Sequence, residues 1–196
     1  MMEITAQQVK ALREKTGAGV ADVKKALEES KGDMEKAFGF IERKLGSVAI
    51  KKATRETGAG VVESYIHSNG RVGALVEIFC ETDFVARNPL FKEFAHDIAL
   101  HVAAMSPVYI SLDAVPPELW NAEKSRFQEE VEKLGKPAAI RDEIIDGKLK
   151  SHFGALSLLT QPFVKDQNKT VGEHLNESIG KFGENMKIGR FIRFEL

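Results

Sequence analysis

One cysteine and five histidines are the side chains of this sequence most suited to nucleophilic or metal chemistry. Cys80 ends a run of alternating apolar residues, and His67 lies on the neighbouring predicted strand, so these two residues are the candidates for a thiol–imidazole pair. Free cysteine is among the most buried residue types, and we interpret Cys80 as a core side chain. His96 and His101 are five residues apart, which places them on different faces of a helix, so no zinc site is expected.

Two TGAG segments, at residues 16–19 and 57–60, have the composition of phosphate-binding loops. The sequence contains no GxxxxGK[ST] and no GxGxxG pattern. Neither segment falls between a predicted strand and a predicted helix, which phosphate binding at a helix N-terminus requires. We interpret the first segment as a turn in which Gly17 ends a helix, and the second as part of a linker. The sequence therefore predicts no cofactor.

The segment from Glu81 to Asn88 connects a predicted buried strand to a predicted helix. Thr82 or Asp83 has the side chain needed to cap a single helical turn, which places Phe84 on a short, tight connection. Spacing alone leaves two interpretations open. Phe84 either packs into the core or projects as an aromatic anchor on a rigid base, the arrangement by which a small surface makes a binding hot spot.

Three short helices are predicted in residues 1–55. Thr5 and Gln8 have the spacing of a capping box at the start of the first helix, which Gly17 ends. Asp33 is a suitable N-cap for the third helix, which we expect to end before Gly46. Few large apolar residues are available here, so the predicted domain is small, about 50 residues. A polar, glycine-containing linker is expected to follow it over residues 47–60, with a helical start of this linker left open as an alternative.

Residues 56–196 predict an α+β core domain with a small antiparallel sheet covered by helices. Two β-rich runs flank Asn69-Gly70, the dipeptide most typical of a hairpin turn. Asn88 and Pro89 begin a helix, and further helical patterns cover roughly residues 117–134, 138–159 and 171–182. A last strand ends the chain. On this strand we expect one buried face made of Met186, Ile188, Ile192, Phe194 and Leu196, opposite Lys187, Arg193 and Glu195.

Composition excludes several classes of protein. Apolar residues make up 43% and charged residues 29% of the chain, as is usual for a globular protein in water. The apolar runs are too short to span a membrane, and the first ten residues lack the basic and apolar regions of a signal peptide. A single cysteine allows no disulfide within the chain. We therefore expect a cytoplasmic protein that has no membrane partner.

Two other classes remain as alternatives. Residues 1–55 hold 12 Lys and Arg against 8 Asp and Glu, so an RNA-binding protein could use this part together with Lys51, Lys52 and Arg55. Its RNA affinity would fall steeply with added salt. The predicted second and third helices lack the Arg, Asn and Gln cluster that reads bases, so direct nucleic-acid binding is not the expectation. A thiol enzyme built on Cys80 is the other alternative, which a fully active Cys80→Ala protein would dismiss.

Five segments together resemble elongation factor Ts, a family of translation factors. They follow the family's order along the whole chain: LREKTGAGVADVKKAL, CETDFVARN, GKP at 135–137, QPFVKD at 161–166, and GEN followed by RFIRFEL. The resemblance implies a ubiquitin-associated-like three-helix domain over residues 1–55 and an α+β core, or dimerisation, domain over residues 56–196. The length is similar to that of the family's short form, which carries one copy of the core.

The resemblance also implies a function without covalent chemistry, and therefore not an enzyme. Members of the family are guanine nucleotide exchange factors that bind elongation factor Tu with GDP and promote GDP release. In the family, the Asp and Phe of the TDFV segment enter the GTPase domain of elongation factor Tu and disturb its magnesium and phosphate site. The matching residues here are Thr82, Asp83, Phe84 and Val85. Incoming GTP then displaces the factor, because the coupling between two ligands is reciprocal.

A second contact is implied near the N-terminus. The family's LRxxTGAG segment touches another helix of the GTPase domain, which points to Arg13, Val20 and Ala21 in this chain. Family members often have two methionines after TGAG, where this chain has valine and alanine, so the implied contact is smaller.

We also expect a homodimer held without a disulfide. One core copy offers half the surface of the two-copy form, and a two-fold interface between identical chains restores it. The C-terminal strand, residues 186–196, is the expected place, because an apolar edge strand must be covered. The alternative is a monomer in which the chain's own helices cover that face.

Overall fold

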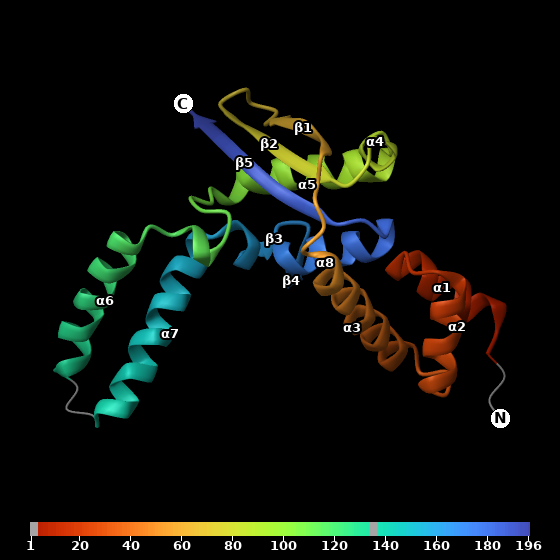
Figure 1. The fold of residues 1–196 in the computed structure, drawn as a ribbon, viewed down its shortest axis with the longest axis horizontal. Coiled ribbons are helices and arrows are strands. Elements are labelled where there is room, and N and C mark those ends of the chain that lie inside the picture. Colours follow the sequence, from red (N-terminus) through yellow and green to blue (C-terminus); the bar gives the residue numbers. More distant parts are fainter. Residues whose placement is uncertain (1–3, 134–136) are drawn as a thin grey trace. The chain divides into compact units, whose positions relative to one another are not determined.

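The computed structural model describes residues 4–133 and 137–196. It confirms a mixed fold with eight α-helices and a small antiparallel sheet (Figure 1). The helices are α1 Ala6–Thr16, α2 Val20–Glu29, α3 Met34–Lys52, α4 Asp83–Ala86, α5 Pro89–Met105, α6 Pro117–Glu132, α7 Ala138–Leu156 and α8 Val171–Phe182. The strands are β1 Ala59–Ile66, β2 Val72–Cys80, β3 Pro162–Phe163, β4 Asp166–Thr170 and β5 Met186–Glu195. The main sheet has the order β1–β2–β5, and β3 and β4 form a separate antiparallel pair.

The chain forms two compact units. In the described residues, the first unit consists of residues 4–62, 78–94 and 173–187, and the second of residues 63–77, 95–172 and 188–196. Each unit therefore joins segments that are far apart in the sequence. In the part of the chain that the structure describes, no helix is long and apolar enough to cross a membrane.

Helices α1, α2 and α3 share an apolar cluster that includes Leu12, Leu27 and Ile41. The predicted capping box at the start of α1 is confirmed, and Gly17 ends the helix in the left-handed region with φ +67°. The expected end of the third helix before Gly46 is wrong, because α3 continues to Lys52. Leu45 and Ala49 are buried on either side of this glycine, and their packing offsets its low helix propensity.

The predicted β1–β2 hairpin is confirmed. Gly70 has φ +67°, and the N–H of His67 donates to the carbonyl oxygen of Val72 at 2.8 Å across the turn. The buried face of β2 consists of Ala74, Val76, Ile78 and Cys80. This alternation matches the period of two that the sequence predicts for a strand with one buried face.

The prediction for β5 is wrong in its second half. Met186 and Ile188 are buried, as expected, but Ile192, Phe194 and Leu196 are exposed. Arg193, expected on the outer face, instead has a side chain that is only 19% exposed. The alternation of the strand therefore changes phase between Ile188 and the residues that follow.

Glu77 and Arg190 give a physical reason for this phase change. The backbone N–H of Arg190 donates to the Glu77 carboxylate at 3.0 Å, and its guanidinium donates to the same carboxylate. A β-bulge adds one residue to a strand, leaves one N–H outside the ladder and reverses the faces beyond it. In β5 the Glu77 side chain accepts the N–H of Arg190 at the point where the faces reverse, as such an irregularity requires.

In the second unit, α6 and α7 run side by side as a helical hairpin (Figure 1). They share an apolar cluster in which the rings of Trp120 and Phe153 stack at a centroid separation of 5.0 Å. Helix α7 ends earlier than predicted, at Leu156, and a short 3-10 helix follows. Two residues of the GKP segment, Gly135 and Lys136, lie outside the described residues. The β3–β4 pair occupies the QPFVKD region and was not expected from the sequence.

Candidate functional site

The single-turn helix α4 projects an aromatic side chain from the first unit. Thr82 has extended backbone dihedrals, and its hydroxyl accepts the N–H of Val85 at 3.4 Å, which makes it the N-cap. Val85 and Ala86 are buried and anchor the turn, whereas Asp83 is exposed and Phe84 is 84% exposed. Of the two interpretations that spacing leaves open, the structure supports the projecting one for Phe84. Val85 faces the core.

The carboxylate of Glu184 holds this turn from the far end of the sequence. It accepts the backbone N–H of Thr82 at 3.1 Å and the Thr82 hydroxyl at 2.6 Å. A carboxylate that accepts two hydrogen bonds from one residue fixes both its backbone and its side chain. Sequence reasoning missed this contact, because no local pattern connects positions 102 residues apart.

The residue before the cap is held in a similar way. Glu81 accepts the backbone N–H of Asn185 at 2.6 Å and lies 3.4 Å from the guanidinium of Arg55. The hydrogen bond from Asn185 is the main reason that the pKa of Glu81 lies below its usual range, and Arg55 adds to the effect. The side-chain amide of Asn185 donates to the carbonyl oxygens of Arg55 and Ala53, at 2.7 and 3.4 Å. In the sequence, only the resemblance to the family points to the GEN segment.

The predicted N-terminal contact residues lie around the TGAG turn at residues 16–19. Arg13 is exposed in the last turn of α1, and Val20 and Ala21 are exposed at the start of α2, with Val20 52% exposed. The hydroxyl of Thr16 donates to the carbonyl oxygen of Leu12 at 2.7 Å and accepts the N–H of Ala18 at 3.3 Å. The turn therefore brings the three predicted side chains to adjacent helix ends.

The side chains suited to covalent or metal chemistry make structural contacts. Cys80 is fully buried, and its thiol donates to the carbonyl oxygen of Thr82 at 3.3 Å. Burial raises the pKa of the Cys80 thiol, which disfavours the reactive thiolate. His101 is buried between Gln161 and the N–H of Val164. Residues 4–133 and 137–196 contain no group of three side chains placed to hold a metal ion.

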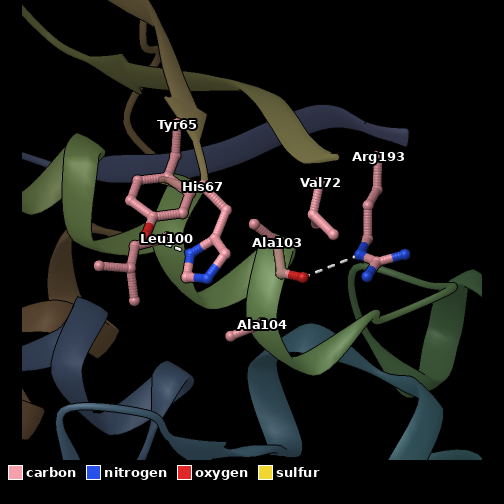
Figure 2. Close-up of a pocket in the computed structure, with 7 residues that line it drawn as sticks. All are labelled: Tyr65, His67, Val72, Leu100, Ala103, Ala104 and Arg193. Carbon is pink, nitrogen blue, oxygen red and sulfur yellow. Dashed lines mark hydrogen bonds between the residues drawn. The ribbon is translucent and has the colours of Figure 1, made fainter. Parts of the chain in front are cut away.

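A pocket of about 360 Å³ lies in the second unit (Figure 2). Its polar side chains are committed to protein partners: the Nε of Arg193 donates to the carbonyl oxygen of Ala103 at 2.9 Å, and the Tyr65 hydroxyl lies 3.1 Å from Nδ1 of His67. Val72, Leu100, Ala103 and Ala104 supply most of the remaining wall. This arrangement offers no nucleophile and no set of metal ligands, so the α4 turn is the stronger candidate site.

Comparison with known proteins identifies the family. The family profile "Elongation factor TS" matches residues 2–196. The elongation factor Ts of Rubrobacter xylanophilus is 49% identical over 190 residues, which cover 97% of each chain. The protein of the same name from Fervidobacterium nodosum is 47% identical over 195 residues, which cover 100% of this chain and 99% of that one. The Geobacter sulfurreducens protein is 48% identical over 195 residues, or 100% and 90% of the two chains. This chain therefore belongs to the elongation factor Ts family, which acts in translation elongation.

Proposed function

We propose that this protein is a guanine nucleotide exchange factor for elongation factor Tu. The observation that carries the proposal is Phe84, an aromatic side chain that is 84% exposed on a turn held by Thr82 and Glu184. Exposing such a large apolar side chain to water does not stabilise a protein that has no partner, whereas a rigidly held aromatic group is typical of a binding hot spot. Family membership supports elongation factor Tu as the partner.

In the proposed mechanism, Phe84 and Asp83 enter the GTPase near its phosphate and magnesium site. A GTPase holds GDP through a phosphate-binding loop and Mg²⁺, so displacing the cation leaves phosphate charge without compensation. The nucleotide then dissociates, and incoming GTP expels the factor by the same coupling free energy. The chain needs only to bind and position these side chains, so the mechanism requires no covalent chemistry and no cofactor. The proposal places the protein in the cytoplasm, where translation occurs.

A second contact is proposed at the TGAG turn, through Arg13, Val20 and Ala21. These side chains are exposed at adjacent helix ends in the three-helix region. We propose residues 1–55 as a ubiquitin-associated-like domain and residues 56–196 as the core domain. Two separate contacts on one chain raise the affinity, because the second forms at a high effective concentration once the first is made.

Release of labelled GDP tests the proposed function directly. A preformed complex of elongation factor Tu with labelled GDP is mixed with excess unlabelled GDP, with and without a catalytic amount of this protein. The dissociation rate is expected to rise in proportion to the concentration of the factor. An unchanged rate, with both proteins shown to be folded, rejects the proposal.

We also propose that the chain forms a homodimer. The phase change in β5 leaves Ile192, Phe194 and Leu196 on the surface, with Phe194 63% exposed, and a groove connects Phe194 and Leu196 to Ile66 and Leu75. Apolar strand faces of this kind are usually covered, and a second copy provides the same surface in return.

Light scattering at micromolar concentration tests the dimer. A dimer mass that is unchanged by reductant is expected, because the only cysteine, Cys80, is buried. Phe194→Asp places a charge on the proposed interface, so this variant is expected to have a monomer mass. A monomer mass for the unaltered chain rejects the dimer, and a dimer that dissociates on reduction rejects the absence of a disulfide.

A further inference from the structure

A short segment of the first unit touches both the α4 turn and the TGAG turn, where the two contacts with elongation factor Tu are proposed. We call residues 180–185, the last turn of α8 and its connection to β5, the α8–β5 corner. A Cβ atom on Gly180 would lie 2.4 Å from Cδ2 of Leu45, so only glycine at position 180 lets α3 and α8 approach each other this closely. The stem of Lys181 packs against Gly17 in the TGAG turn, where an added Cβ would lie 2.8 Å from Cε.

The corner itself is held by the chain that leaves α3. The amide of Asn185 donates to the carbonyl oxygens of Ala53 and Arg55, and the ammonium group of Lys52 donates to the carbonyl oxygen of Gly183. These bonds anchor the corner on both sides of Glu184. The backbone of Glu184 is therefore fixed, and this limits the positions from which its carboxylate binds Thr82.

Helix α4 depends on outside support, since it has only four residues. A helix of one turn is unstable by itself, because nucleation costs more than a single turn of hydrogen bonds returns. Its own cap is weak, at 3.4 Å from the Val85 N–H to the Thr82 hydroxyl oxygen. The two bonds from Thr82 to Glu184 are shorter, at 3.1 and 2.6 Å, and one of them also orients that hydroxyl toward the carboxylate.

We propose that Glu184 is a positioning residue for nucleotide exchange. By binding the N–H and the hydroxyl of Thr82, it sets the start of α4 and with it the direction in which Phe84 projects. It acts through Phe84 and does not itself touch elongation factor Tu. This inference rests on the proposed function and adds to it a residue outside the TDFV segment. Hot-spot side chains bind well only when their supporting contacts fix them beforehand.

The first test concerns the free protein and needs no partner. Glu184→Gln keeps the shape of the side chain but leaves one acceptor oxygen for two Thr82 donors, and it removes the negative charge that strengthens both bonds. Amide hydrogen exchange of the full chain is expected to show protection at Thr82 falling by about tenfold or more, with little change in the α5 amides. The control is Glu56→Gln, which removes the same charge from an exposed carboxylate on the linker. Unchanged protection at Thr82 in Glu184→Gln overturns the proposal.

The second test measures exchange. The second-order rate constant for GDP release is expected to fall about five- to tenfold in Glu184→Gln, while the melting temperature stays close to that of the unaltered chain. Thr82→Val removes the other partner of the 2.6 Å bond and serves as a second variant. The double variant is expected to lose less than the sum of the two single losses, since both changes break the bond between the Thr82 hydroxyl and Glu184. Additive losses overturn the pairing of these two residues.

A background of Phe84→Ala separates this inference from the proposed function. If Glu184 acts through Phe84, adding Glu184→Gln to Phe84→Ala produces no further loss of exchange. A further fivefold loss in that background overturns action through Phe84, because the loss then requires another contact. If Phe84→Ala alone leaves GDP release unchanged, the proposed role of the α4 turn fails. If Phe84→Ala slows release and Glu184→Gln does not, only the inference about Glu184 fails.

Discussion

The α4 turn and the TGAG turn both place an apolar side chain on the surface at the start of a helix, but they are held differently. Phe84 stands on a four-residue helix whose N-cap bonds to Glu184, 102 positions away. Val20 begins a ten-residue helix, and its N-cap, Gly19, makes no side-chain hydrogen bond. The long helix is stabilised by buried residues such as Val23 and Leu27, whereas the short one has little core of its own.

The two turns are held in place by two different kinds of contact. In the TGAG turn, a local hydrogen bond from Thr16 to Leu12 and a left-handed Gly17 define the chain reversal. In the α4 turn, local capping is too weak, and distant side chains complete it. The hydrogen bonds and the backbone reversal of the first arrangement involve neighbouring residues, although the distant Lys181 stem also packs against it. The second depends on the whole fold.

The largest expected effect comes from the exposed aromatic side chain. Phe84→Ala is expected to slow exchange by about 30-fold or more, because truncating an aromatic hot spot costs about 2 kcal/mol or more in binding. The melting temperature is expected to change little, since the side chain is 84% exposed. Stopped-flow GDP release and thermal unfolding measure the two quantities on the same samples.

A matched control for Phe84 is available on α6. Leu119 is another exposed apolar residue, outside the proposed contacts, so Leu119→Ala is expected to leave exchange unchanged. A Phe84→Ala variant with a collapsed melting temperature and normal exchange per folded molecule would show that the side chain supports the fold. Phe84 would then contribute to stability and not to exchange, and the α4 turn would not be a binding surface.

Local hydrogen bonding made several helix boundaries predictable from the sequence, above all the positions where helices begin. The capping box of Thr5 and Gln8, the left-handed Gly17 and the N-caps of Asp33 and Asn88 each involve residues within four positions of each other. Short-range hydrogen bonds of this kind depend on residue type and spacing, which the sequence displays directly. The same reasoning identified the α4 turn as a capped connection.

Long-range contacts account for what the sequence did not predict. The sequence of β5 predicts one continuous apolar face, whereas the burial of its residues changes phase after Ile188, where the N–H of Arg190 donates to Glu77. Glu184 and Asn185 stand in an ordinary polar turn, and nothing near them indicates that they hold Thr82 and Arg55. The tertiary fold brings such partners together, so rules based on sequence spacing do not predict them.

The second prediction alters the reversal of the TGAG turn. Gly17→Ala is expected to destabilise the chain by about 1–2 kcal/mol, since the residue has φ +67° and the added Cβ would lie 2.8 Å from the Lys181 stem. For a chain of this size the melting temperature is expected to fall by roughly 2–8 °C. Gly19→Ala is the control, because Gly19 has φ −62° and no described atom within 4 Å of its added Cβ. Equal losses in the two variants would contradict the left-handed turn as the cause.

The third prediction measures the smaller apolar contact. Val20→Ser is expected to weaken binding to elongation factor Tu by about 1 kcal/mol, or roughly fivefold, because it removes part of an apolar surface that is 52% exposed. Titration calorimetry with the GDP-bound GTPase measures this change. The loss should be clearly smaller than that for Phe84→Ala. A loss as large as that of Phe84→Ala would show that both turns carry equal shares of the binding energy.

The smallest expected effect comes from giving α2 the cap that α4 already has. Gly19→Ser adds a hydroxyl at the N-cap, where the backbone is extended with φ −62° and ψ 147°, so serine fits without strain. The cap and the reduced freedom of the unfolded chain together are expected to stabilise the protein by about 0.5–1 kcal/mol. The melting temperature of the free protein is then expected to rise by roughly 1–4 °C. Gly19→Ala separates the two contributions, because alanine reduces the same freedom and supplies no cap. A serine variant that is no more stable than the alanine variant would show that buried side chains alone determine where α2 begins.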